Sequence, residues 1–224
     1  MYRNTFLSVM FLACCFNGNL CAQGDAQIYE RTCDAKTYPF SDPSPVATPN
    51  NSYYPYFRFD GFSMQAQEKQ WKMVVLENDY VKLTVTPEIG GKIWGAIDKV
   101  NNKEFVYTNG VVKFRDVAMR GPWTSGGIEF NFGIIGHAPT CSTPIDYLTK
   151  KNVDGSVSCH IFSYEWITRT VWNVEINLPK DKAYFTTHTT WFNQSSIDQP
   201  YYQWMNAGYA TRSEERRVGK ECLR

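Results

Sequence analysis

The sequence has almost no net charge. Its 23 lysines and arginines nearly balance its 22 aspartates and glutamates, which leaves a formal net charge of +1. Proteins that bind nucleic acid or an anionic lipid surface through electrostatic attraction carry a clear excess of positive charge. We therefore expect neither nucleic acid nor an acidic membrane surface to be a partner.

Long apolar runs are also missing. Residues 6–16 form an apolar stretch that is too short to cross a bilayer, and no later stretch is apolar enough to cross a membrane. This stretch follows Arg3 and precedes the small residue Ala22, an order typical of a secretory signal peptide. We predict a signal peptide over residues 1–22 and a secreted or periplasmic protein with no membrane span. A lipoprotein anchor is the alternative, on one of the cysteines at positions 14, 15 and 21, although the residues before each fit that pattern poorly.

None of the seven cysteines forms a CxxC motif. Three of them lie in the predicted signal peptide, and Cys222 lies near the end of the chain. This spacing argues against a zinc site and against a disulfide-dense scaffold, so we expect no metal and no cofactor. For the remaining three, two readings stay open: one disulfide, such as Cys141 with Cys159, or buried free thiols that include Cys33.

A sustained helical period is absent as well. Residues 80–86, YVKLTVT, instead alternate between apolar and polar side chains, which is the period of a half-buried strand. Many such short stretches are separated by glycine, asparagine, aspartate and proline. The pattern predicts an all-β fold, an antiparallel β-sandwich. The expected strands are 56–59, 72–76, 80–86, 92–98, 104–107, 153–166, 168–178, 183–193 and 201–209.

The two ends of the chain differ from this β-rich body. Residues 23–55 contain five prolines, which predict a lead-in of surface coil with short extended pieces. Residues 212–222, RSEERRVGKEC, resemble the translation of a common sequencing-adapter oligonucleotide. We therefore expect a sandwich domain over 56–211, C-terminally truncated, and a non-native tail over 212–224. An ordinary charged, solvated tail is the alternative.

Two segments carry a family resemblance. Residues 76–107, LENDYVKLTVTPEIGGKIWGAIDKVNNKEFVY, resemble the opening hairpins of aldose-1-epimerase-like proteins. Residues 120–140, RGPWTSGGIEFNFGIIGHAPT, and 198–207, DQPYYQWMNA, resemble a secreted bacterial branch known as domain of unknown function 5107. The resemblance implies a galactose-mutarotase-like β-supersandwich with a carbohydrate cleft on a concave face. It does not fix the reaction, because epimerases, glycoside hydrolases and polysaccharide lyase domains share this superfamily.

The glycine-rich stretch 120–137 holds the side chains best suited to bind a sugar. Planar polar groups pair with vicinal hydroxyls, and an aromatic face stacks under a pyranose ring. In the run 128–132, alternation places Glu129 and Asn131 on one face and the three apolar residues on the other. The candidate residues of this stretch are Arg120, Trp123, Glu129, Asn131 and His137. Ordinary roles remain open for each: core packing, a surface ion pair, or a loop histidine bonded to a carbonyl.

The candidate set also includes three residues from the C-terminal part of the sequence. His188 lies in a strand-like run, and Trp204 and Asn206 share one face of the last predicted strand. The Cys159–His160 pair is a poor metal site, because neighbouring residues on a strand point to opposite faces.

Three hypotheses for function follow, all with an oligosaccharide or monosaccharide ligand. In the first, the protein acts on glycosidic bonds, with Glu129 as acid or base. In the second, it is an aldose epimerase-like enzyme that uses His137 or His188. In the third, it is a non-catalytic carbohydrate-binding module that holds its ligand through Trp123 and Arg120.

Overall fold

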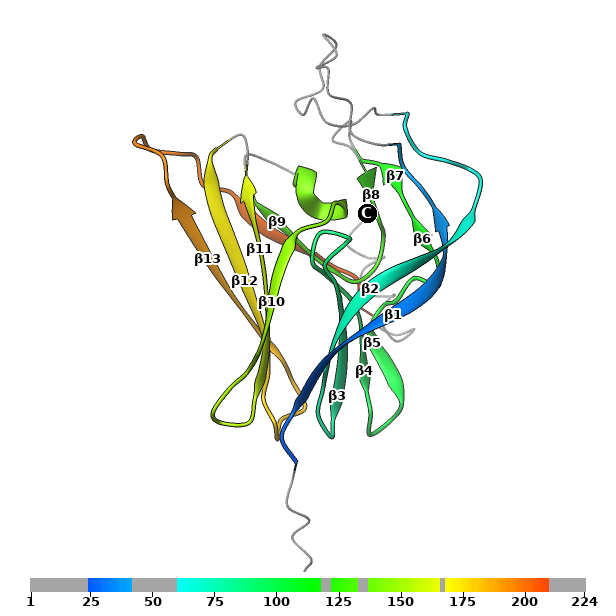
Figure 1. Cartoon of the computed structure of the whole chain (residues 1–224), viewed down its shortest axis with the longest axis vertical. Helices are drawn as coiled ribbons and strands as arrows, with labels where there is room; N and C mark the ends of the chain where they lie inside the picture. The colour runs from blue at the N-terminus through cyan, green and yellow to red at the C-terminus, as the bar shows by residue number, and fades with distance from the viewer. Residues whose placement is uncertain (1–23, 42–59, 118–121, 133–136, 166–167, 210–224) are drawn as a thin grey trace, which may run out of the picture.

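Strands make up nearly all of the regular structure (Figure 1). The structure, a computed structural model, describes residues 24–41, 60–117, 122–132, 137–165 and 168–209. Within these ranges the one helical element is the short 3-10 helix η1, Pro139–Ser142, and no helix is long and apolar enough to span a membrane. The prediction of an all-β fold is confirmed.

Two sheets form the body of the protein. The larger has eight strands in the order β14-β9-β4-β3-β2-β1-β6, with β5 added beside β4. Its strands are β1 Gln27–Tyr38, β2 Gln67–Glu77, β3 Val81–Thr86, β4 Lys92–Asp98, β5 Lys103–Val106, β6 Val112–Lys113, β9 Ile128–Phe132 and β14 Gln203–Ala207. The smaller sheet is antiparallel and contains β10 Asp146–Lys151, β11 Val157–Glu165, β12 Thr170–Leu178 and β13 Thr186–Asn193. A two-stranded ribbon joins β7 Arg115–Asp116 to β8 Pro122–Trp123.

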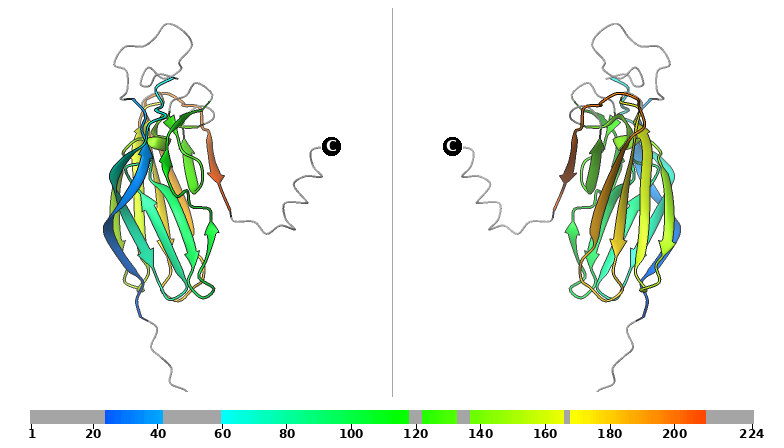
Figure 2. Two further views of the ribbon diagram at one scale, coloured as in Figure 1. Left: turned by 90° about the vertical axis from the view of Figure 1, so that its right-hand side faces the viewer. Right: turned by 90° about the vertical axis from the view of Figure 1, so that its left-hand side faces the viewer.

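The two sheets lie face to face (Figure 2). Apolar side chains from both sheets fill the space between them. Along β12, buried residues alternate with half-buried ones, which is the pattern of a strand with one face in the core. Phe132 of β9 stacks on Trp172 of β12 with ring centroids 4.5 Å apart and an interplanar angle of 12°. This contact fixes which face of β9 turns toward the smaller sheet.

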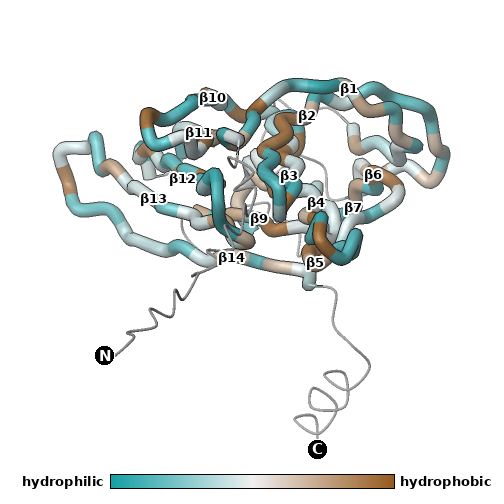
Figure 3. Tube along the Cα trace, turned by 90° about the horizontal axis from the view of Figure 1, so that it is seen from below, coloured by the Kyte–Doolittle hydropathy of each residue, from teal (hydrophilic) through white to brown (hydrophobic). Residues whose placement is uncertain are grey.

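The opposite face of the larger sheet carries a second apolar cluster. Trp71 and Met73 of β2 belong to this cluster, whereas Val74 and Leu76 of the same strand point into the core between the sheets. Figure 3 shows hydrophobic residues of β2 at the centre, between β10–β13 on one side and β6 and β7 on the other. The larger sheet is therefore covered by apolar contacts on both faces along β2.

Strand β9 turns its two faces to these two environments. Ile128, Phe130 and Phe132 belong to the core between the sheets, and each is at most 4% exposed. Glu129 and Asn131 point the other way, as the alternation predicts, yet they are also buried. Strand β9 is thus buried at every position, so its polar side chains also lie inside the protein rather than in water.

The predicted coil over 23–55 is wrong for its first part. Gln27–Tyr38 forms the longest strand of the sheet and pairs with β2 over eleven residue pairs, from Gln27–Glu77 to Thr37–Gln67. The prolines do limit the strand, because the first of them, Pro39, directly follows its last residue. Residues 42–59, which include the predicted strand 56–59, lie outside the described residues, as do residues 1–23 and the tail from residue 210.

The open choice between a disulfide and free thiols is resolved for three cysteines. Cys33, Cys141 and Cys159 are all free, and the last two are buried. A bridge between Cys141 and Cys159 is therefore absent. Cys159 lies in the core while its neighbour His160 is partly exposed, as expected for adjacent residues of a strand.

Gly127 sets the position at which β9 begins. Its φ is +68°, a left-handed conformation that residues with a Cβ rarely adopt. A Cβ at this position would also overlap the carbonyl oxygen of Ile93 in β4, the strand that pairs with β9 at Ile128. Glycine therefore permits the close approach that brings Glu129 next to β4.

We expect Gly127→Ala to lower the free energy of unfolding by about 1–3 kcal/mol through backbone strain, and by more if β4 is displaced. Urea unfolding of the purified protein measures the change. Gly110→Ala is the control, because a Cβ there meets no atom within 4 Å. Equal stabilities for the two variants would contradict this role of Gly127.

Candidate active site

Strand β14 brings two predicted residues next to Glu129 and Asn131. In the antiparallel pair of β14 and β9, Asn206 is opposite Glu129 and Trp204 is opposite Asn131. Residues directly opposite each other in an antiparallel pair share one face of the sheet. Four of the residues singled out in the sequence therefore form one cluster on the face that points away from the smaller sheet.

Glu129 lies at the centre of this cluster and is 1% exposed. Its Oε1 accepts hydrogen bonds from the Asn131 side-chain amide at 2.8 Å and from His137 Nδ1 at 2.5 Å. The Asn131 carbonyl oxygen in turn accepts a hydrogen bond from the backbone N–H of Ala138, at 2.7 Å. Asn131 thus holds both the carboxylate and the segment that carries His137.

These bonds determine which nitrogen of His137 carries the proton. The backbone N–H of Ala138 can only donate, so the amide of Asn131 must turn its oxygen toward Ala138 and its NH₂ toward Glu129. The carboxylate of Glu129 can only accept, so the proton between it and His137 sits on Nδ1. In the neutral imidazole, Nε2 then remains as an acceptor.

Lys92 is a member of the cluster that the sequence analysis missed. Its Nζ lies 3.8 Å from Glu129 Oε2 and donates hydrogen bonds to Thr124 O at 2.5 Å and Thr124 Oγ1 at 3.1 Å. The side chains of Lys92 and Glu129 are 1% and 2% exposed. Burial lowers the pKa of Lys92 below that of an exposed lysine, and the negative charge of Glu129 opposes this effect.

Two indole rings contact the imidazole of His137. The ring of Trp204 lies edge-on to it with centroids 4.9 Å apart, and that of Trp123 does so at 5.8 Å. His137 is partly exposed, at 17% of its side chain, whereas Glu129 behind it is buried. Of these two side chains, the imidazole is therefore the one that solvent or a ligand can reach.

Among the described residues, two buried polar atoms of the cluster have no hydrogen-bond partner. They are Oε2 of Glu129, an acceptor, and Nε1 of Trp123, a donor. Unsatisfied buried polar atoms are rare in proteins, and a catalytic role or a bound water or ion is the usual explanation. One molecule with a hydroxyl group has both functions that these atoms require.

The thiol of Cys141, in η1, lies at the edge of the cluster. Its Sγ donates to the carbonyl oxygen of Pro122 at 3.6 Å. Burial strongly raises the pKa of this thiol, and the charge of Glu129 raises it further. Cys141 is therefore a neutral, buried thiol and not a nucleophile.

The remaining predicted residues do not join the cluster. His188 lies on β13 of the smaller sheet, exposed and opposite Glu175. Arg120 lies outside the described residues. Among the residues that the structure describes, no group of three or more histidine, cysteine, aspartate or glutamate side chains could hold a metal ion.

Comparison with known proteins identifies a protein family and a similar solved structure. The model of a family described as "Domain of unknown function (DUF5107)" matches residues 48–217, a range that starts before Tyr56 and extends past Thr211. The crystal structure of a TPR-domain containing protein from Parabacteroides distasonis ATCC 8503, at 2.26 Å resolution, is 26% identical, with a TM-score of 0.75. The match covers 83% of this chain and 32% of that one, so the chain spans about a third of the length of that protein.

We expect Lys92→Met to lower the free energy of unfolding by about 3–5 kcal/mol, because it leaves the buried carboxylate of Glu129 without its cation. Urea unfolding measures the loss. Lys82→Met is the control: Lys82 pairs with Glu77 at 3.5 Å, but both side chains are part-exposed, so we expect a loss of less than about 1 kcal/mol.

The same pair of proteins tests the lowered pKa of Lys92. Between that pKa and the 10.5 of an exposed lysine, the unfolded chain binds more protons than the folded one. The contribution of Lys92 to the free energy of unfolding therefore rises with pH in this window. The stability difference between wild type and Lys92→Met should widen as the pH is raised from about 7 to about 10. A difference that narrows over this range would show that the pKa is not lowered.

Proposed function

The chain belongs to the DUF5107 family, and from the geometry of its site we propose that it is a carbohydrate-active protein in which His137 transfers protons on a bound sugar. The observation that carries this proposal is the 2.5 Å contact between His137 and a buried carboxylate, next to two indole rings. The galactose-mutarotase-like relationship, which the sequence resemblance implies, is part of the same proposal.

A sugar suits this site for two reasons. Indole rings provide apolar surface for the C–H groups of a pyranose, and both Trp123 and Trp204 are only partly buried. A sugar hydroxyl can accept a hydrogen bond from Nε1 of Trp123 and donate one to Oε2 of Glu129, the two atoms that lack partners. Asn206, opposite Glu129 and partly exposed, adds an amide of the kind that pairs with vicinal hydroxyls.

The chemistry that we infer uses His137 as the acid–base group and Glu129 as its positioning residue. Nε2 of the neutral imidazole takes the proton of the hydroxyl on the anomeric carbon. The C–O bond to the ring oxygen then breaks, a carbonyl forms, and the imidazolium returns its proton to the ring oxygen. The carboxylate of Glu129 accepts the hydrogen bond from Nδ1 and its negative charge stabilises the imidazolium, and Lys92 places a positive charge 3.8 Å from Oε2.

This arrangement favours interconversion of anomers over the hydrolysis of glycosides by Glu129. Glycoside hydrolysis normally uses two carboxylates on either side of the scissile bond. Glu129 is 1% exposed, and its Oε1 is already bonded to Asn131 and His137. In the proposed site Glu129 therefore exchanges no proton with the sugar: Oε1 positions the imidazole, and Oε2 only accepts a hydrogen bond from a hydroxyl group.

We expect Glu129→Gln to lower the turnover of sugar anomers by about 10²–10⁴-fold with little change in sugar affinity, because an amide can donate to Nδ1 and favour the wrong tautomer. Polarimetry and NMR of free sugars measure turnover, and release of aryl alcohols from aryl glycosides tests hydrolysis in parallel. Glu175→Gln is the matched control, since Glu175 lies 3.8 Å from His160 on the smaller sheet.

The outcomes separate the three hypotheses. Full turnover in Glu129→Gln would contradict the role of the Glu129–His137 pair. Cleavage of aryl glycosides that depends on Glu129 would favour a glycoside hydrolase. Sugar binding without any turnover in the wild-type protein would leave only a carbohydrate-binding module.

We also propose that the protein is exported and that residues 1–22 are removed. The support is the order of Arg3, the apolar residues 6–16 and Ala22 in the sequence. On expression of the full chain in a bacterium, N-terminal sequencing of the exported product should begin at Gln23. Replacement of Phe11 and Leu12 by aspartate should block export. A product that keeps Met1, or one that begins at an acylated cysteine, would refute this cleavage.

A further inference from the structure

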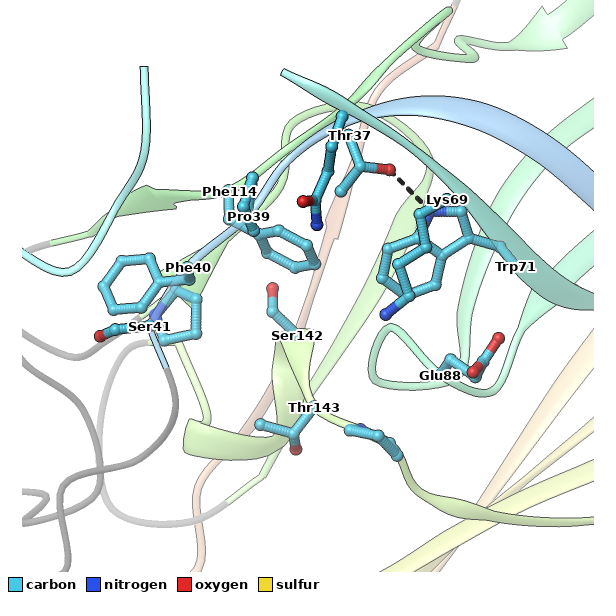
Figure 4. Close-up of a pocket in the computed structure, with 13 residues that line it drawn as sticks. Thr37, Pro39, Phe40, Ser41, Lys69, Trp71, Glu88, Phe114, Ser142 and Thr143 are labelled. Carbon is cyan, nitrogen blue, oxygen red and sulfur yellow. Dashed lines mark hydrogen bonds between the residues drawn. The ribbon is translucent and has the colours of Figure 1, made fainter. Parts of the chain in front are cut away.

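A pocket of about 280 Å³ opens between the end of β1, the start of β2 and η1 (Figure 4). The residues that line it include Phe40, Lys69, Trp71, Glu88, Phe114 and Ser142. None of these residues belongs to the Glu129–His137 cluster, so the pocket is a separate feature of the same face of the larger sheet.

A thin wall separates the pocket from that cluster. Pro122 and Ser142 line the pocket, and the residues next to them in sequence, Trp123 and Cys141, belong to the cluster. The contact from Cys141 Sγ to the carbonyl oxygen of Pro122 holds the two halves of the wall together. A ligand in the pocket would therefore lie close to the proposed site without entering it.

The walls of the pocket are aromatic. The rings of Trp71 and Phe114 lie with centroids 6.0 Å apart, and Phe40 packs against the same apolar cluster. The indole N–H of Trp71 donates to Thr37 Oγ1 at 2.9 Å, which holds the ring in place. These walls are flat aromatic surfaces that suit the apolar face of a small ring.

Polar groups of three kinds reach the same space. Ser142 is 6% exposed. Among the described residues, its hydroxyl has one polar contact, a weak one with the sulfur of Cys141 at 3.9 Å. Figure 4 shows the Ser142 side chain directed into the pocket. The Nζ of Lys69 lies 3.8 Å above the ring of Trp71. Glu88 also lines the pocket, and its Oε2 accepts a hydrogen bond from the backbone N–H of Lys72.

From this combination we propose that the pocket is a second carbohydrate-binding site that takes one pyranose ring. Its volume lies just below the range of about 300–1,000 Å³ that accommodates drug-sized ligands, so a single ring is a fitting size. The aromatic walls receive the C–H face of the sugar, and Ser142, Lys69 and Glu88 receive its hydroxyls.

The charges argue against other ligand classes. Lys69 and Glu88 carry opposite charges, so the pocket does not favour a ligand of either net charge. A purely apolar ring would leave the buried hydroxyl of Ser142 with its weak sulfur contact alone, whereas a sugar hydroxyl would satisfy it. A neutral ring with several hydroxyl groups meets both conditions.

Titration of the ¹⁵N-labelled protein with the methyl glycosides of glucose, galactose, mannose and xylose tests this proposal. The indole N–H signal of Trp71 reports on the pocket, and that of Trp123 reports on the Glu129–His137 site. We expect at least one glycoside to shift the Trp71 signal, and Ser142→Ala to weaken that binding by about five- to tenfold. Glu129→Gln should leave the Trp71 titration unchanged.

Lys69→Met provides the same test on an exposed side chain if Ser142→Ala does not fold, and Lys36→Met is its matched control on β1. The proposal is overturned if no glycoside shifts the Trp71 signal, or if benzyl alcohol binds there as well as any sugar. If sugars shift only the Trp123 signal, the second site is refuted while the proposed function stands. If they shift only the Trp71 signal, the second site stands and the proposed function fails.

Discussion

A carboxylate that water does not reach must be balanced by charge and by hydrogen bonds, and the arrangement around Glu129 meets this requirement from three directions. Lys92 supplies the opposite charge from β4, and Asn131 supplies an amide from β9, the strand that carries Glu129. His137 supplies an N–H from the segment that follows β9. Each of these groups is fixed by a second bond or by burial. The charge of one side chain therefore organises three separate parts of the chain.

The sequence predicts those parts of the site that depend on strand alternation. Apolar residues at every second position of 128–132 place Glu129 and Asn131 on one face, and the structure agrees because Phe132 stacks on Trp172. The pairing of β14 with β9 then aligns Trp204 and Asn206 with them. Lys92 was missed because a lysine at the start of a strand is normally solvated. The available signal was its neighbour Ile93, a core residue opposite Ile128. Adjacent residues of a strand point to opposite faces, so Lys92 had to lie on the same face as Glu129.

Elements whose formation depends on distant partners were harder to predict. Strand β1 has mostly exposed side chains, and only the short run 33–37 alternates between at least partly buried and exposed residues, so its sequence alone gives a weak strand signal. It exists as a strand because it pairs with β2 along almost its whole length. The prolines that follow suggested coil for the entire region, although the first of them only marks where the strand stops.

The sandwich is held together by contacts between residues far apart in the chain, and this has a consequence for how it folds. The side-chain amide of Asn78 donates to the carbonyl oxygen of Pro179, 101 residues away, and β14 joins the sheet from the far end of the described chain. Such non-local contacts slow folding, because a long loop must close before any contact repays its entropy. Trp204 lies on β14. We therefore expect the contacts of Trp123 and Trp204 with His137 to form among the last steps of folding, after the two sheets have packed together.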